Sequence, residues 1–470
     1  MKWQWGLLSV CLAAFTFYAG CGFENTEPVG SDCSNGCIIS TNRNSEETMT
    51  TARPNTGTQI TAEDIVFTGK DYELEKAWIL AKQDVLKNYC MDTRFGKTFA
   101  AGAYGGFSGW RGLAFNRDTT YAGLLALNSL YPEEMLTSYK TIRRVRLNLG
   151  WNCYPDFVLH GIDGVIVHED LSLDDFRRQY CKASAINKTD DVCWLWGAYD
   201  LLVKTDADEA EWSWLYETGK ECFEKLYTPF WDEARQLYFG QPTFIDVGAN
   251  GYPESFGFKT EEARNNGVWV YASSTNSLYY KALCIMAEAA ECLGESEESK
   301  AWKARAEILR KSMCEKLRFA DGTFMYFLHR DGHPEERREV LGTAFPVLTG
   351  VVTGEDAKRC VAGYRVTEYG ADLITPFYPG TSSLHNNSTW PFADTFLLLA
   401  KEQAEGRDYT ELNLEVLKNM MRDGHMCEFR NTRTNTISGQ TAQLWAIAAY
   451  LNTVIRAGLT DAPKNLIEIY

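Results

Sequence analysis

Histidine and closely spaced cysteine, which build most protein sites for transition metals, are both scarce in this chain. It contains 6 histidines among 470 residues. Its 14 cysteines include no Cys-x-x-Cys pair. Zinc and iron–sulfur sites usually need such pairs or several histidines. We therefore expect no metal site and no cofactor.

Positive charge is also in deficit. The chain has 47 Lys and Arg against 63 Asp and Glu, so its net charge is −16 and its pI is near 5.0. Nucleic-acid binding leaves a footprint of clustered basic residues, and the sequence shows no basic stripe. This pattern excludes nucleic acid as an expected partner, and it disfavours polyanionic substrates.

Long hydrophobic runs are missing except at the start of the chain. After Lys2, residues 5–18 are apolar, and Ala-Gly-Cys follows at 19–21. A transmembrane helix needs about 20 apolar residues, whereas this shorter run is typical of a signal peptide. The Ala-Gly-Cys tripeptide resembles a bacterial lipobox, in which the cysteine is lipidated. We expect residues 1–21 to be a lipoprotein signal peptide, with a lipid anchor at Cys21 as the only membrane attachment.

This anchor would place the protein in the cell envelope, at the outer membrane or in the periplasm; simple secretion is the alternative. Residues 22–60 have no aromatic residue after Phe23 and are rich in Asn, Ser, Thr and Gly, so we expect a flexible tether. Cys33 and Cys37 would suit a disulfide in an oxidising compartment. The cysteines farther along are expected to be buried free thiols.

Helical patterns dominate from residue 61 onward, in a composition that is 45% hydrophobic and 13% aromatic. The predicted helices are 62–89, 119–149, 190–203, 209–227, 275–293, 297–316, 339–351, 355–363, 387–404, 410–422 and 440–458. Strand-like stretches are short and few, at 237–240 and 323–328. A continuous series of helical hairpins closes naturally into a double ring. We therefore predict an all-α fold, an (α/α)6 toroid, as one domain over residues 61–470.

Charged and aromatic residues gather where the early helices begin. Arg117 and Asp118 precede the helix at 119, in a segment that starts with Trp110. Asp190 and Asp191 open the next helix after Thr189. These residues could simply form ion pairs and helix caps, because helix starts favour acidic side chains. In a sugar site, the same pairs would offer donors and acceptors to adjacent hydroxyls.

Two later junctions have the same character. Residues 380–392 gather His385, Asn386 and Trp390 before a helix. Glu428 lies in an apolar segment, and Gln440 follows it after a polar loop. A capped loop and a surface glutamate are the structural alternatives for these two junctions.

The order of these motifs resembles the six-hairpin glycosidase superfamily. This superfamily includes glucoamylases, the glucosidase part of glycogen-debranching enzymes, and mannosylglycerate-hydrolase-like enzymes. In its members an Arg-Asp pair that opens an early helix holds the terminal sugar, and Arg117-Asp118 matches that pair. A helix start of the form Asp-Ala-Ser/Thr-Leu-Trp carries the general acid, and residues 190–194 match its spacing. Asp191 leaves the acid ambiguous between two neighbours.

The later motifs follow in the same order. Residues 385–391 resemble a His-Asn/Gln-Gly-Ser/Thr-Val-Trp-Pro segment, with Asn387 in place of the glycine. A late glutamate, then a loop, then Gly-x-x-x-Gln-x-Trp carries the general base in the superfamily; Glu428 and residues 439–445 match. Residues 274–280 and 244–246 resemble further site segments. The resemblance covers roughly residues 100–455.

The resemblance implies an exported, inverting exo-glycoside hydrolase that acts on an α-glycosidic bond of an oligosaccharide or glycan. Asp190 would be the general acid and Glu428 the general base, the two carboxyl groups that such hydrolysis needs. The implied substrate-binding residues are Trp110, Arg117, Asp118, Asp191, Trp194, Asp246, Asn276, His385, Asn386, Trp390 and Gln440. Two alternatives remain: an unsaturated uronyl hydrolase or polysaccharide lyase on a similar toroid, and a non-catalytic glycan-binding lipoprotein.

Overall fold

The computed structural model describes residues 60–89, 91–93, 96–102, 113–149, 158–159, 189–224, 230–240, 242–244, 270–380 and 384–470. These residues belong to the unit Thr56–Tyr470. The expected signal peptide, nearly all of the expected tether, Cys21, Trp110 and Asp246 lie outside the described residues. No helix within the described ranges is long and apolar enough to cross a membrane.

An inner ring of helices forms the centre of this unit. Its members are α3 (Asn116–Ala122), α7 (Asp190–Lys204), α10 (Ser273–Cys292), α12 (Val340–Leu348), α14 (Pro391–Glu405) and α16 (Leu444–Arg456). Each packs against the next in chain order, and α16 packs against α3. The inner helices therefore form a closed ring.

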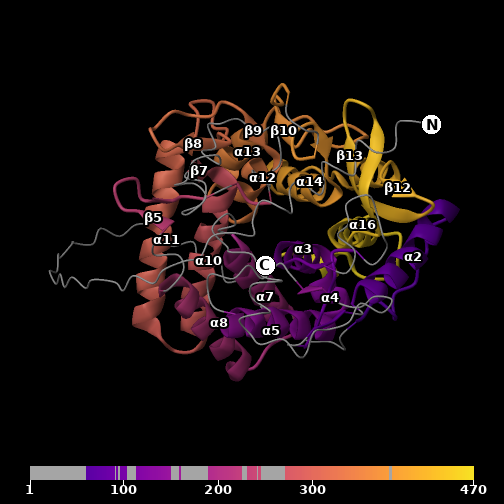
Figure 1. Ribbon diagram of the computed structural model, residues 1–470, viewed down its shortest axis with the longest axis horizontal. Helices are drawn as coiled ribbons and strands as arrows, with labels where there is room; N and C mark the ends of the chain where they lie inside the picture. The colour runs from indigo at the N-terminus through magenta and orange to yellow at the C-terminus, as the bar shows by residue number, and fades with distance from the viewer. Residues whose placement is uncertain are drawn as a thin grey trace. The chain divides into compact units, whose positions relative to one another are not determined.

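Outer helices alternate with the inner ones along the chain. They are α2 (Tyr72–Asn88), α5 (Pro132–Leu149), α8 (Glu209–Cys222), α11 (Ser296–Lys316), α13 (Gly354–Val361) and α15 (Thr410–Lys418). Each packs on one or two inner helices, and in Figure 1 the elements follow one another from α2 through α8 and α13 back to α16. This alternation of outer and inner helices confirms the predicted (α/α)6 toroid.

Burial differs between the two rings for a geometric reason. An inner helix has neighbours on nearly all sides, and α7 is buried from Asp190 to Leu202. The outer helix α2 buries Leu74, Trp78 and Val85 on one face and exposes the other. The inner helix α7 is therefore buried on all sides, whereas the outer helix α2 has the one-sided pattern of an amphipathic helix.

The predicted helix at 119–149 is wrong in one respect, because it contains a break. After α3, the chain continues through the π-turn η1 (Gly123–Leu127) and the short α4 (Asn128–Leu130). The outer helix α5 then begins at Pro132. Proline suits the first turn of a helix because the amide hydrogen that it lacks is not needed there. Pro132 therefore marks the point where the inner helix ends and the outer one starts.

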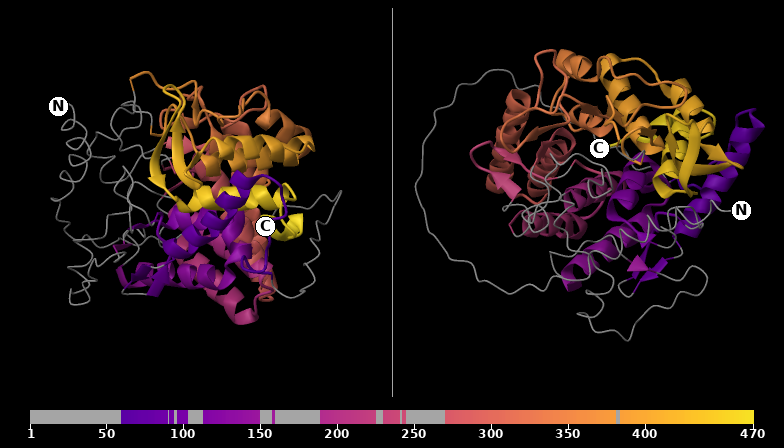
Figure 2. Two further views of the ribbon diagram at one scale, coloured as in Figure 1. Left: turned by 90° about the vertical axis from the view of Figure 1, so that its right-hand side faces the viewer. Right: turned by 45° about the horizontal axis from the view of Figure 1, so that its top comes forward.

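Short strands line the connections between the helices. They are β1 (Met91–Thr93), β2 (Gly96–Thr98), β3 (Leu113–Ala114), β4 (Val158–Leu159), β5 (Trp231–Asp232), β6 (Leu237–Tyr238), β7 (Val270–Ala272), β8 (Phe327–His329), β9 (Arg338–Glu339), β10 (Ile374–Thr375), β11 (Ser388–Thr389), β12 (Met421–Arg422), β13 (His425–Asn431) and β14 (Thr436–Thr441). Strands β11 to β14 form one antiparallel sheet around β13, which lies beside α2 (Figure 2). The predicted helices 410–422 and 440–458 are therefore too long: β12 follows the first, and β14 precedes the second.

The C-terminal segment fastens the ring at the end where α7 finishes. A 3-10 turn, η5 (Lys464–Ile467), precedes it. The Tyr470 amide donates to Asp200 Oδ1 at 2.8 Å, and Trp196 Nε1 donates to the Tyr470 carbonyl at 2.7 Å. Ser129 Oγ donates to the Leu466 carbonyl at 2.6 Å. The tail thus joins α4 to α7.

Candidate active site

The N-terminal ends of the inner helices are connected to one another by hydrogen bonds. Asn116, the first residue of α3, donates to the carbonyl of Asp190, the first residue of α7, at 2.6 Å. Thr189 lies 3.1 Å from Thr243, oxygen to oxygen, and the Thr243 amide donates to Ser274 at the start of α10 at 3.3 Å. The starts of α3, α7 and α10 therefore lie together.

Glu339 continues this circle from α10 to α12. Its carboxylate caps α12 by accepting the amides of Leu341 at 3.0 Å and Gly342 at 2.7 Å, and it also accepts from the Ser274 side chain. Complete burial raises the pKa of Glu339 to about 8 against these hydrogen bonds. The residue therefore joins two inner helices at the same end of the ring.

The circle closes through α14 and α16. The Val340 amide donates to the Leu373 carbonyl at 3.0 Å, and the Leu373 amide donates to Ser388, just before α14, at 2.9 Å. Phe392 in the first turn of α14 stacks on Trp445 in the first turn of α16, with ring centroids 4.1 Å apart. All six inner helices thus begin at one end of the toroid.

Helices α3 and α7 position Asp190, the predicted general acid. Arg117 Nε lies 3.2 Å from Asp190 Oδ1, and these side chains are 9% and 4% exposed. Burial raises the pKa of Cys193, one turn further along α7, to about 12. The Cys193 thiol is therefore neutral, and it bonds to Tyr121 from α3. The contact between Cys193 and Tyr121 holds α7 against α3, and so keeps Asp190 beside Arg117.

Asp191 and Trp194 are the other predicted site residues on α7. Burial raises the pKa of Tyr279 on α10, and the charges of both Asp191 and Asp190 add to this effect, so both carboxyl groups lie near α10. Trp194 Nε1 donates to the Tyr139 carbonyl at 3.2 Å, so Trp194 packs toward the outer helix α5. Of these helix residues, Asp190 is the one paired with Arg117.

The β13–β14 hairpin positions Glu428, the predicted general base. Glu428 on β13 is 6% exposed, and its Oε2 accepts the amide of Gln440 on β14 at 2.6 Å. Gly439 has φ +80°, and a Cβ there would lie 2.3 Å from Glu428 Oε2. A Cβ at Gly102 would lie 2.4 Å from Gln440 Cγ. Two glycines therefore leave the space that Glu428 and Gln440 occupy.

Contacts of Gln440 and Gln443 join these two parts of the site. Gln443 Nε2, two residues after β14, donates to Asp118 Oδ1 at 2.8 Å. Asp118 is next to Arg117, which pairs with Asp190. Gln440, three residues before Gln443, donates its backbone amide to Glu428. The structure thus brings together Arg117, Asp118, Asp190, Glu428 and Gln440, although they are far apart in sequence.

Aromatic rings pack beside this cluster. His385, Trp390 and Phe429 form a stack, with centroid distances of 5.2 Å and 5.0 Å. The edge of Phe244 meets His385 at 5.0 Å and Trp390 at 4.9 Å. Phe244 has φ +67°, which is rare outside glycine and costs about 1–3 kcal/mol. Such strain persists where the surrounding structure requires it, and Phe244 fixes His385 and Trp390.

Two predicted site residues use their amide groups on the protein backbone. The Asn276 side chain bonds to both the amide and the carbonyl of Tyr238, at 2.8 Å and 2.9 Å. The Asn386 side chain binds the amide and carbonyl of Tyr378 at 2.7 Å and 2.8 Å. Both residues therefore hold loops at the site end of the ring, and their contact with sugar stays a prediction.

Comparison with solved structures shows where this arrangement has been seen before. The chain is similar to a GH78 family rhamnosidase of Bacillus sp. GL1, with 16% identity, a TM-score of 0.54 and 85% of this chain covered. It spans 36% of that rhamnosidase. It is also similar to a GH63 mannosylglycerate hydrolase from Thermus thermophilus, solved with glucose, with 14% identity, a TM-score of 0.54, and 79% and 99% of the two chains covered.

A further similar structure is a glycosidase, E335A, in complex with glucose; its TM-score is 0.54 and its identity 16%, with 83% of this chain and all of that chain covered. The fold is that of the six-hairpin glycosidases. The sequence itself matches no protein-family model and no curated protein. At these identities the similarity establishes the fold, and the activity has to be argued from the site.

Within this six-hairpin fold, two site residues were not predicted as such. Gln443 is the glutamine of the Gly-x-x-x-Gln-x-Trp motif, so a signal for it was present in the sequence. Gly102 has no such signal, because its role comes from the close approach of Gln440 in space. Within the described ranges, no group of His, Cys, Asp and Glu side chains could hold a metal ion.

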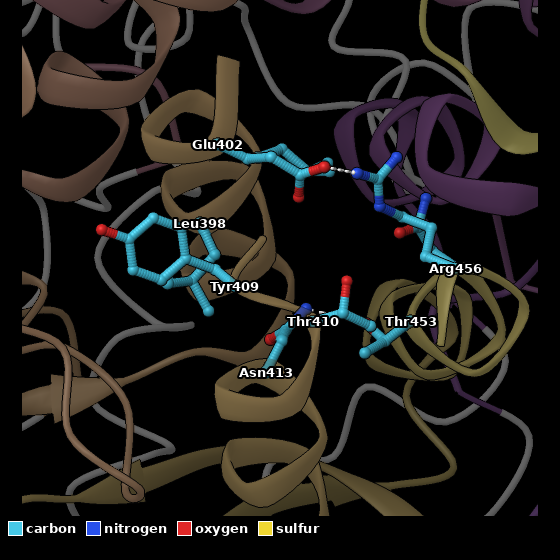
Figure 3. A pocket seen from close by; sticks show the side chains of 9 residues that line it. Leu398, Glu402, Tyr409, Thr410, Asn413, Thr453 and Arg456 are labelled. Atoms are coloured by element: carbon cyan, nitrogen blue, oxygen red, sulfur yellow. Dashed lines mark hydrogen bonds and ion pairs between the residues drawn. The ribbon is translucent and has the colours of Figure 1, made fainter. Parts of the chain in front are cut away.

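A small pocket lies at the other end of the glycosidase fold, among α14, α15 and α16 (Figure 3). It is lined by the later turns of α14 and α16, opposite the helix starts described above. Asn413 Nδ2 donates to Thr453 Oγ1 at 2.7 Å, and Arg456 pairs with Glu402. Because these polar groups bond to one another across three helices, the pocket serves the packing of α15 on the ring.

Proposed function

We propose that this protein is an exported, inverting exo-glycoside hydrolase that cleaves an α-glycosidic bond of an oligosaccharide or glycan. The observation that carries the proposal is a set of three contacts: Glu428 with the Gln440 amide, Gln443 with Asp118, and Arg117, the neighbour of Asp118 in the chain, with Asp190. It ties two buried carboxyl groups, from segments far apart in sequence, to one end of a glycosidase toroid. Chain connectivity alone does not require this convergence.

The chemistry assigns one role to each carboxyl group. Asp190 gives its proton to the glycosidic oxygen as the bond from that oxygen to the anomeric carbon breaks. Glu428 takes a proton from the water that attacks the anomeric carbon from the opposite face. In inverting enzymes the two carboxyl groups are roughly 6.5–9.5 Å apart, which leaves room for that water. Asp191 is the alternative acid.

Arg117 and Asp118 are proposed to hold the terminal sugar. Arg117 offers a fork of donors and Asp118 two acceptor oxygens, which suit neighbouring hydroxyl groups. Sugar hydroxyls that accept the Arg117 N–H would replace Asp190 as its partner at 3.2 Å. Binding of the sugar would in this way release Asp190 from its ion pair and let it act as the acid.

The remaining predicted contacts complete the substrate site. The residues proposed to line it are Trp110, Asp191, Trp194, Asp246, Asn276, His385, Asn386, Trp390 and Gln440. Trp390 is stacked between His385 and Phe429, so its contact with a sugar would be through the ring edge. Because two of the similar structures were solved with glucose, glucosides are the first substrates to test.

The activity is tested with a panel of aryl α- and β-glycosides and oligosaccharides. Hydrolysis is followed by NMR, so that the anomer formed first is seen before it equilibrates. We expect release of a terminal sugar from an α-glycoside with inverted configuration. Retained configuration would reject the two assigned roles, and binding of glycans without hydrolysis would favour a glycan-binding lipoprotein instead.

Export and anchoring are proposed from the sequence of residues 1–21. Lipidation at Cys21 would leave the catalytic domain on a tether at the cell envelope. Intact-mass analysis of protein extracted from membranes should show a lipid on an N-terminal cysteine. A soluble product that is cleaved elsewhere and carries no lipid would instead support simple secretion.

A further inference from the structure

We propose that Gln443 is a positioning residue that holds the Asp118 carboxylate in a fixed position relative to Glu428. The kinetic part of this inference rests on the proposed glycosidase function, in which Asp118 binds the terminal sugar. The structural part, a donor–acceptor contact between α16 and α3, does not depend on it. Gln443 itself is 3% exposed, and its side-chain amide donates to the Asp118 carboxylate.

The orientation of the Gln443 amide is fixed by two different partners. Its Oε1 accepts the backbone amide of Trp445 at 3.2 Å and so caps α16. Because the oxygen has to face that N–H, the NH₂ group faces Asp118 Oδ1, at 2.8 Å. One side chain therefore satisfies a helix end and a carboxylate together.

The backbone of the turn is held equally firmly. The Ala442 amide donates to the Met426 carbonyl at 2.8 Å, and the Leu444 amide donates to the Ala101 carbonyl at 2.8 Å. Asn88 of α2 donates to the Ala442 carbonyl at 3.1 Å. Ala442 is fully buried with φ +57°, a left-handed conformation that such contacts have to maintain. Gln443 therefore starts from a fixed position.

The segment from Gln440 to Gln443 also positions Glu428, because the Gln440 amide donates to its carboxylate. Asp118 arrives from α3 on the other side, and Gln443 is its link to that segment. A carboxylate rotates about χ2 in a broad, shallow well unless a partner fixes it. Loss of the Gln443 donor would remove one of the contacts that orient the Asp118 carboxylate, and binding of the terminal sugar would weaken.

The experiment compares two substitutions at this position in the full chain. Gln443→Met has a similar shape and removes both hydrogen bonds. Gln443→Glu keeps the helix cap but places a second carboxylate against Asp118, and two adjacent carboxylates share a proton. Gln403→Met is the matched control, because Gln403 on α14 is exposed and bonds to the Val347 carbonyl, away from the site.

The expected kinetic result is a split between KM and kcat. Gln443→Met should raise KM about 10-fold and leave kcat within about 3-fold, since uniform binding energy is lost. Gln443→Glu should have a similar defect at pH 7 and recover as pH falls toward 5, because its protonated carboxyl can donate to Asp118. Ratios to the wild type at each pH cancel the titration of Asp190 and Glu428, and Gln403→Met should keep the wild-type KM.

Thermal unfolding tests the contact separately from activity. A carboxyl pair that binds its proton more tightly when folded is stable at low pH and loses stability as pH rises. The Tm of Gln443→Glu should therefore fall between pH 5 and 7 relative to both the wild type and Gln443→Met. A Tm difference that does not change with pH would overturn the contact, and wild-type KM in both variants would overturn the positioning role.

A wild-type chain that hydrolyses no glycoside would refute the proposed function and leave this Tm result as the test of the contact. If the wild type is active and the Gln443 variants keep its KM, the proposed function stands and the positioning role of Gln443 is refuted. The two failures are therefore distinguishable.

Discussion

The informative residues of this protein are buried charges at helix starts and on strand β13. Arg117, Asp118, Asp190 and Glu428 are each less than 10% exposed. Charged side chains are rarely buried unless they are paired, because their desolvation is costly. Here the pairs converge at the site end of the inner ring. That costly grouping supports a catalytic role better than helix capping does, because capping does not require contact between α3, α7 and α16.

The two catalytic assignments predict different responses to the leaving group. Asp190→Asn should lower kcat/KM on natural glycosides by about 10²–10⁴-fold. On aryl glycosides with good leaving groups the loss should be much smaller, because those leaving groups need little protonation. Glu428→Gln should lose activity on both classes, since each still needs an activated water. Steady-state rates on the two substrate classes provide the comparison.

Asp191→Asn is the control for this experiment, because it removes the neighbouring carboxylate. It should retain more activity than Asp190→Asn on natural substrates. If Asp191→Asn is inactive and Asp190→Asn is active, the acid is Asp191 and the match to the superfamily motif shifts by one residue.

Glu339 predicts a pH dependence of stability. Its pKa is about 8 in the folded protein and 4.5 by its ordinary value. The unfolded chain therefore binds fewer protons in this interval, and stability falls as pH rises through it. Glu339→Gln removes this titration, so relative to the wild type its free energy of unfolding should rise between pH 5 and 7, by about 2–3 kcal/mol. Urea unfolding at the two pH values measures the difference, and parallel changes in both proteins would contradict it.

At the scale of elements, the β13–β14 hairpin carries Glu428, the proposed general base. Its strands exchange backbone hydrogen bonds, with a register shift between Cys427 and Phe429, where Glu428 lies. Such irregularities re-aim a side chain next to active sites. The hairpin is also tied to α2, because His425 Nδ1 lies 2.6 Å from Asp84 Oδ2. The position of Glu428 is thus set by the element as a whole.

Gly439→Ala tests this arrangement with a close structural control. Gly439 and Gly350 have φ values of +80° and +83°, so alanine costs about 1–2 kcal/mol at each. Only at position 439 does the new Cβ strike Glu428, whereas nothing lies within 4 Å at 350. Gly439→Ala should lose kcat about 10-fold or more, while Gly350→Ala should keep it. Comparable kcat values for the two variants would mean that the close contact with Glu428 does not matter.

Helices were predictable from the sequence because their apolar periodicity extends over many residues. The starts of α7, α11 and α13 fall within about one residue of their predicted positions. The β13–β14 hairpin was not predicted, because β13 is buried along most of its length and so lacks clear alternation, and the end of β14 lies within the helix predicted at 440–458. The break at Pro132 had a local signal, whereas the hairpin depends on contacts that the sequence does not display.

The site was predictable to the extent that motifs carry it. Arg117, Asp118, Asp190 and Glu428 were named from their order and spacing, and the fold brings them together. The partners of Asn276 and Asn386 were not predictable, because an asparagine that binds a backbone segment looks like one that binds a sugar. The contact of Gly102 with Gln440 was likewise not predictable, because the residues next to Gly102 in the sequence give no sign of it.

At the scale of the whole molecule, the ring separates function from stability. The inner helices begin at the site and end at the face that the C-terminal segment covers. At that far end, Asp200 is fully buried and accepts from Asn128 at 2.8 Å, from Lys204 at 2.9 Å and from the Tyr470 amide at 2.8 Å. One aspartate on α7 thus holds the far end, and another, Asp190, faces the site.

The last prediction uses these two residues of one helix. Asp200→Asn removes the buried charge opposite Lys204 and one strong acceptor, which should lower the free energy of unfolding by about 1–3 kcal/mol. Its kcat/KM should stay at the wild-type value, because no contact described for Asp200 reaches the site end. Asp190→Asn should instead lose activity, and its free energy of unfolding should also fall, because Arg117 loses a buried carboxylate partner. Urea unfolding and hydrolysis rates on the same two variants check both halves. Loss of activity in Asp200→Asn at temperatures well below its Tm would mean that the two ends of the ring are coupled through α7.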